Sequence, residues 1–135
     1  MKTKFKFRST EFNCTYPKEY FINPGCYGDD VACWLSKKLT DKGIEVTGHP
    51  DQEDFGWFFT FIVDGVEHCL VIAFQPNDPE RGDRWIGWIE RHVGFVNSIF
   101  GGRKRGILPD AIRAVDEILS TSKEIDLVGW FPQRE

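Results

Sequence analysis

The sequence lacks any long apolar segment. Alternating Phe and Lys residues follow Met1 where a signal peptide would place an apolar run, which predicts that the chain carries no export signal. The densest apolar stretch, from Trp57 to Val63, is too short to cross a bilayer. We therefore predict a cytoplasmic protein with no membrane partner.

Paired metal ligands and common catalytic motifs are missing as well. The four cysteines show no Cys-x-x-Cys spacing, and His49, His68 and His92 lie too far apart to form a typical zinc motif. There is no Gly-x-Ser-x-Gly nucleophile elbow and no loop with Walker spacing. These absences favour reduced thiols, no metal site and no cofactor, and they lean against an enzyme without excluding one.

The sequence also lacks an excess of positive charge. Lysine and arginine number 17 against 21 aspartate and glutamate residues, which gives a net charge of −4. Proteins that bind nucleic acid without sequence preference are normally basic, so this balance disfavours such a function without excluding it. Aromatic residues, in contrast, make up 15% of the 135 residues, which is enough ring surface for a core and a binding face.

Local patterns predict a single α+β domain that spans residues 1–135. A helix is expected from Asp29 to Lys42, where apolar residues recur at helical spacing, and a second from Pro109 to Ser120. The order β-α-β-β-β-β-α-β predicts a mainly antiparallel sheet of five to six strands with two helices packed on one face. The expected strands are 4–8, 44–47, 57–63, 66–74, 84–91 and 126–131, and a helical turn is expected at 95–100.

The dipeptide Asp64-Gly65, between two apolar runs, is the strongest local signal. It favours a type I′ hairpin, in which Val63 pairs with Val66 and Phe61 pairs with His68. This register places His68 on the core face of the sheet. We expect a hydrogen-bonded core histidine there rather than a metal ligand.

The same register places Phe58, Ile62 and Val71 together on the second face of the sheet. Two helices on one face leave this second face uncovered, and exposed apolar patches usually mark interfaces. We therefore predict that a homodimer or a protein partner docks there. Phe58 is the expected anchor because aromatic residues dominate interface energetics.

Carboxylates cluster at Asp51, Glu53 and Asp54, just before a strand. Such a cluster could hold a hard cation or meet a basic partner, although it lacks EF-hand spacing. Runs of carboxylates are more often solvated loops, and we favour that interpretation here. If Phe58 is not the interface, this cluster is the next candidate for partner binding.

The segment Glu53-Asp54-Phe55-Gly56-Trp57 resembles one found in small, uncharacterised bacterial cytosolic proteins. The resemblance extends from about Asn23 to Trp88, and its motif is the five-residue segment itself. It implies a bacterial cytosolic protein. It supplies no activity and no catalytic residues.

Cations cluster at Arg103, Lys104 and Arg105 in a loop flanked by glycines. Together with the cations on the outer face of the 4–8 strand, they could form a positive patch that binds an anion or single-stranded nucleic acid. A solvated loop is the favoured alternative, because the net charge is negative and no RNP-like Gly-Phe pattern occurs.

The leading functional hypothesis is a non-enzymatic binding protein that occludes or sequesters a macromolecular partner. Immunity proteins and other small inhibitors are compact acidic domains that lack a catalytic constellation, and the analogy rests on size and charge. A small-ligand binder or enzyme, with a pocket between the sheet and the 9–28 loop, is the first alternative. A nucleic-acid accessory protein that uses the basic loop is the second.

Overall fold

The computed structural model describes residues 2–13, 16, 18–22, 26–53, 55–76, 84–91 and 106–132. These residues form six strands and two helices in the predicted order β-α-β-β-β-β-α-β. The helical turn expected at 95–100 lies outside the described residues. The elements are β1 (Lys2–Arg8), α1 (Asp29–Asp41), β2 (Glu45–Glu53), β3 (Gly56–Val63), β4 (Val66–Gln75), β5 (Arg84–Arg91), α2 (Pro109–Thr121) and β6 (Asp126–Pro132).

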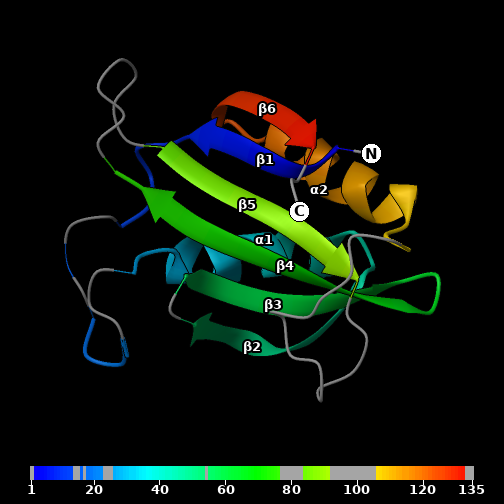
Figure 1. Ribbon diagram of the computed structural model, residues 1–135, viewed down its shortest axis with the longest axis horizontal. Helices are drawn as coiled ribbons and strands as arrows, with labels where there is room; N and C mark the ends of the chain where they lie inside the picture. The colour runs from blue at the N-terminus through cyan, green and yellow to red at the C-terminus, as the bar shows by residue number, and fades with distance from the viewer. Residues whose placement is uncertain are drawn as a thin grey trace.

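The six strands form one antiparallel sheet, and both helices lie behind it in Figure 1. The strand order is β2-β3-β4-β5-β1-β6, so the first strand of the chain lies between the fifth and the sixth. The prediction of a mainly antiparallel sheet with two helices on one face is confirmed. One face of the sheet therefore carries the core, and the other faces away from both helices.

The hairpin between β3 and β4 has the predicted register. Val63 pairs with Val66 and Phe61 with His68. Both turn residues have positive φ, 50° at Asp64 and 75° at Gly65, as a type I′ turn requires. The two turn residues thus determine which side chains of β3 and β4 face the helices.

Substitution of Gly65 by valine is expected to lower the free energy of unfolding by at least about 1 kcal/mol. A Cβ atom on this residue would meet no other atom within 4 Å, so the expected loss comes from backbone strain and not from a clash. Gly65→Asn is the matched control, because asparagine tolerates positive φ. Urea unfolding of both variants checks the prediction, and equal stability of the two variants would contradict it.

The core lies between the sheet and the helices and is dominated by rings. The helices contribute buried aliphatic side chains from one stripe each, and Trp130 of β6 donates a hydrogen bond to Asp116 of α2 at 2.7 Å. That bond connects the far edge of the sheet to the second helix. The fully buried large side chains of the sheet and helices include Phe5, Phe7, Phe59, Phe61, Trp85, Leu35, Leu39 and Leu119.

The strand β2 differs from the prediction. A short strand at 44–47, closed by a turn at 48–50, was expected, but the strand continues to Glu53. Its pairing with β3 is irregular between Thr47 and Asp51, and β2 is an edge strand. Pro50 is tolerated because an edge strand has one side without sheet hydrogen bonds. The described carboxylates Asp51 and Glu53 therefore lie on a strand and not in a loop.

His68 is a hydrogen-bonded core histidine, as predicted. Its side chain has no exposed surface, and its ring stacks on Phe61 with 5.5 Å between the ring centroids. The Nδ1 atom lies 3.0 Å from the carbonyl oxygen of Val66, and Nε2 accepts a hydrogen bond from the backbone N–H of Leu108 at 3.1 Å. Both contacts are satisfied by one neutral tautomer, with the proton on Nδ1. The ring thus connects β4 to the start of α2.

Candidate functional site

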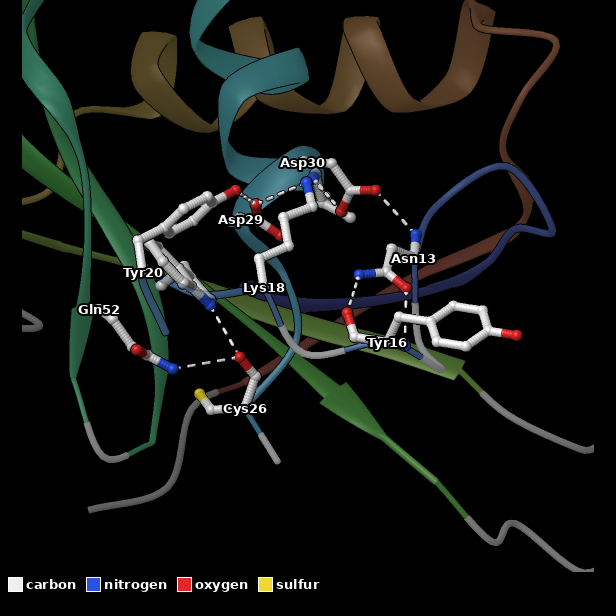
Figure 2. Close-up of polar contacts among 10 residues, drawn as sticks. Asn13, Tyr16, Lys18, Tyr20, Cys26, Asp29, Asp30 and Gln52 are labelled. Carbon is white, nitrogen blue, oxygen red and sulfur yellow. Dashed lines mark hydrogen bonds and ion pairs between the residues drawn. The ribbon is translucent and has the colours of Figure 1, made fainter. Parts of the chain in front are cut away.

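A buried carboxylate at the start of α1 holds the loop that precedes this helix. Asp29 is 5% exposed, and its Oδ2 atom lies 3.0 Å from Nζ of Lys18. The hydroxyl of Tyr20 donates a hydrogen bond to the same oxygen. Figure 2 shows the two loop side chains converging on Asp29. An ion pair between a buried carboxylate and a loop lysine fixes the loop at the positive end of the helix.

The neighbouring Asp30 fastens the earlier part of the same loop. Its Oδ2 accepts a hydrogen bond from the backbone N–H of Asn13 at 2.7 Å, and its Oδ1 accepts one from the N–H of Val31 at 3.0 Å. The Asn13 side chain in turn bonds the backbone N–H and C=O of Tyr16, at 3.1 and 2.8 Å. Tyr16 points away from Asp29 in Figure 2.

The later part of the loop is anchored on the β2–β3 hairpin. The indole N–H of Trp57 donates to the carbonyl oxygen of Cys26 at 2.8 Å, and the amide of Gln52 donates to the same oxygen at 3.3 Å. Gln52 also accepts a hydrogen bond from the backbone N–H of Ile22. Phe21, which is 7% exposed, packs its ring 5.2 Å from that of Trp57. The loop is therefore fixed at both ends.

A pocket of about 330 Å³ lies between this loop, the start of α1 and β2. Two of its lining residues, Tyr20 and Ile22, are 60% and 80% exposed and form its rim. These two exposed side chains give the rim of the pocket an apolar character. The remaining lining residues are Asp29, Cys33, His49, Pro50, Asp51, Gln52 and Trp57.

The pKa values around the pocket are shifted in directions that suppress nucleophilic and base chemistry. Hydrogen bonds to Asp29 and Tyr20 raise the pKa of Lys18, so its ammonium group stays charged. Loss of hydration and the hydrogen bond to Asp29 raise the pKa of Tyr20. Loss of hydration and the nearby charge of Asp29 raise the pKa of the Cys33 thiol. A catalytic lysine or thiolate needs the opposite shift, so these groups are not activated as nucleophiles.

The predicted acidic cluster lies partly at this pocket. Asp51 is exposed and lines the pocket, and Glu53 is half-buried at the end of β2. Asp54 lies outside the described residues, as do Arg103, Lys104 and Arg105 of the predicted basic loop. Among the described residues, no three His, Cys, Asp or Glu side chains lie close enough together to hold a metal ion.

The predicted apolar patch on the second sheet face is present but is mostly covered. Phe58 pairs with Val71 in the predicted register, and both belong to a small cluster on this face. Val71 has no exposed surface, while Phe58 and Ile62 are half-buried. The ring of Phe55 also packs against this cluster. Only part of the predicted patch therefore remains available for contact.

Sequence reasoning did not bring Asp29, Lys18 and Tyr20 together. A carboxylate in the first turn of a helix is stabilised by the helix dipole, so the position of Asp29 gave no sign of a further role. The sequence around Lys18 and Tyr20 gave no sign that either side chain contacts Asp29. The pocket itself lies under the 9–28 loop, where a small-ligand pocket was the alternative prediction.

Comparisons with protein-family models, with curated proteins and with solved structures found no match to this chain. The resemblance of the segment that ends at Trp57 to small bacterial proteins therefore stays a prediction. Neither described helix combines the length and the apolar character that a membrane-spanning helix needs.

Proposed function

We propose that this protein is a non-enzymatic binding protein whose partner is another protein that docks over the pocket. The docking surface consists of Tyr20, Ile22 and Asp51, which all line the pocket. The single observation that carries the proposal is the exposure of large apolar side chains. Tyr20 and Ile22 are 60% and 80% exposed, and they are two of the four exposed large hydrophobic residues among those described.

The contacts that hold residues 18–22 in place support this proposal. Association is weakened when a flexible segment must be ordered, so a segment that is already held in place binds more tightly. The contacts of Lys18 and Tyr20 with Asp29, and of Ile22 with Gln52, hold the loop before any partner arrives. Tyrosine is also enriched at protein interfaces because its ring is apolar and its hydroxyl is polar.

The charges around the docking surface favour a basic partner. Glu19 and Asp51 are exposed, while the positive charge of Lys18 is already paired with Asp29. A partner segment with lysine or arginine beside an apolar side chain would match this surface. A small molecule is the competing ligand, but the pocket is at the small end of the range for such ligands, and its rim is open.

Substitution of Ile22 by aspartate is expected to weaken partner binding at least about tenfold without unfolding the protein. Ile22 is 80% exposed and uses only its backbone N–H in the loop, so the side chain is dispensable for folding. A photo-crosslinker at position 22 identifies the partner, and calorimetry with the purified partner then measures the dissociation constant for each variant.

The matched control is Leu127→Asp, because Leu127 is 74% exposed on β6, at the opposite edge of the sheet from β2. We expect this variant to bind as the unmodified protein does. Equal affinities for the two variants would reject the docking surface. Shifts in melting temperature with a metabolite panel, without any crosslinked protein, would assign the pocket to a small ligand instead. Light scattering distinguishes a second copy of this chain from a different partner.

A further inference from the structure

The outer face of β1 is a row of cations. Residues of this strand alternate between buried side chains that face the helices and half-buried or exposed side chains on the opposite face. Figure 1 shows β1 inside the sheet, between β5 and β6, with both helices behind the sheet. The outer face of β1 is the one that faces away from the helices. The cations on this face are Lys2, Lys4, Lys6 and Arg8.

Aromatic rings lie next to these cations on the two neighbouring strands. Lys4 is opposite Trp88 of β5 on one side and Phe131 of β6 on the other. The Nζ atoms of Lys4 and Lys6 lie 5.5 and 4.7 Å from the centre of the Phe131 ring. The register extends the row further, because Trp88 is opposite Val71, and Val71 is opposite Phe58. Three rings and a lysine thus lie in one line across the sheet.

A hollow of about 250 Å³ continues the cationic surface at one end of β1. It is lined by three cations, Lys6, Arg8 and Arg84, together with Phe131. The nearby acidic groups are fewer: Asp126 is opposite Arg8, and Glu90 is 7% exposed and accepts a hydrogen bond from the indole of Trp88.

The lysines and arginines of the described strands all belong to β1 and β5, whereas the carboxylates are spread over the sheet and include Asp126 on β6. The exposed carboxylate Asp51 belongs to β2 at one edge, whereas the cations belong to β1 and β5 near the other. The net charge of −4 is therefore compatible with a local positive surface. Electrostatic attraction acts over about 10 Å at 0.1 M salt, so the local surface determines the encounter with a charged ligand.

We propose that this surface, made of Lys2, Lys4, Lys6, Arg8, Arg84 and Phe131, binds single-stranded nucleic acid. The cations contact backbone phosphates, and a base stacks on the ring of Phe131. Single-stranded nucleic acid is bound by proteins that combine a basic groove with rings on which bases stack, and a sheet backed by helices is one such platform. In the free protein Lys4 and Lys6 lie over the ring of Phe131. When a base stacks on this ring, their flexible side chains move to the phosphates.

Rings interleaved with the cations favour this ligand over an anionic membrane or an acidic protein. Phosphate groups alone need only positive charge, whereas a base also needs a ring face. The surface is separate from the proposed docking surface, because β6 and β2 are the opposite edges of the sheet. Failure of one proposal therefore leaves the other standing.

The first experiment measures the salt dependence of binding to a labelled oligothymidine of about 12 nucleotides. We expect binding at about 50 mM salt that weakens steeply toward 200 mM. The triple variant Lys2→Ser, Lys4→Ser, Lys6→Ser is expected to bind at least about tenfold more weakly. Its log–log salt slope should be shallower by about 2, since each lost phosphate contact on a single strand removes about 0.7.

The matched control removes the same charge from helix α1 and the segment after α2. Lys37→Ser, Lys38→Ser, Lys123→Ser changes three exposed lysines that do not belong to the outer face of the sheet. We expect this variant to keep the affinity and the salt slope of the unmodified protein. Equal weakening by both triple variants would show that only net charge matters, and would overturn the proposal.

The second experiment tests the stacking of a base on Phe131. Phe131→Ala is expected to weaken binding between about fivefold and about 150-fold, while Phe131→Trp retains it because the ring face is kept. Thermal melting confirms that β6 still folds in both variants. Loss of affinity in the alanine variant alone supports stacking, and equal affinities of the alanine and tryptophan variants overturn it.

The same anisotropy assay separates the competing ligands. Duplex DNA of equal length and vesicles that contain phosphatidylserine are measured beside the single strand. Tighter binding to either of these would assign the surface to that ligand and overturn the proposal. No retention of the oligonucleotide by the unmodified protein at low salt would also overturn it.

Discussion

Alanine in place of Gly87 is expected to destabilise the protein by about 3 kcal/mol or more, the upper end of the range for overpacking a core. A Cβ atom on this residue would lie 2.3 Å from Cζ of Phe5 and 2.8 Å from the carbonyl oxygen of Val71. Phe5 has no exposed surface and is held between Phe7 and Trp130, with ring centroids at 6.2 and 5.0 Å. Neither the ring nor the neighbouring backbone has space to move.

The matched control is Gly129→Ala, on β6. A Cβ atom there would meet no atom within 4 Å, so the same chemical change adds no clash. We expect this control to unfold at the denaturant concentration of the unmodified protein or slightly above, because alanine reduces the entropy of the unfolded chain. Chemical denaturation compares the two variants. A Gly87→Ala protein as stable as the control would show that β1 and β5 are not packed as described.

Acidification below about pH 6.5 is expected to destabilise the fold through His68. Burial lowers the pKa of His68; the hydrogen bond to Val66 offsets part of this effect, and the charge of Arg91 adds a smaller lowering. The unfolded chain therefore takes up a proton at a higher pH than the folded one. The contribution of His68 is complete above about pH 6.5 and is lost as the pH falls, by up to about 1.4 kcal/mol per unit.

Denaturant titrations at several pH values between 7 and 5 measure this loss. The control is His68→Gln, whose amide oxygen can accept the hydrogen bond of Leu108 and whose side chain does not titrate. We expect the variant to be less stable at pH 7 and to lose less stability on acidification, since it lacks the buried imidazole. Parallel pH profiles for the two proteins would show that His68 does not become charged on unfolding.

The hairpin was predictable because its information is local. Asp64-Gly65 determines the turn type, the turn type determines the register, and the register assigns each side chain of two strands to one face. The helices were predictable for the same reason, since their apolar stripes and end signals lie within a few turns. The helix predicted to end at Lys42 ends at Asp41.

The order of the strands and the extent of β2 depend on contacts that no local pattern contains. Gly48, His49 and Pro50 have the composition of a turn, yet they continue an edge strand through an irregular register. Whether β1 lies at an edge or between β5 and β6 depends on partners from the second half of the chain. Lysines are typical of edge strands, yet this strand lies inside the sheet.

The location of the site could be predicted from the sequence, but its chemistry could not. A pocket between the sheet and the 9–28 loop was the alternative hypothesis, because a long connection without secondary structure usually packs or binds something. Its chemistry depends on Asp29 lying where both Lys18 and Tyr20 reach one oxygen atom, which requires the path of the loop. The exposure of Ile22 likewise becomes visible only once Phe21 is seen to fill the core beside it.

The central position of β1 has a consequence for how the chain is made. A ribosome releases this strand before the other five, and β5 and β6, which it joins, are the last two strands of the sheet to emerge. Until then Phe5 and Phe7 have no sheet to complete, and β5 has an open edge on the side that β1 will occupy. The meander from β2 to β5 contains only neighbouring pairings and can assemble without them. In this order of synthesis we expect the sheet to be completed when β1 pairs with the two late strands β5 and β6.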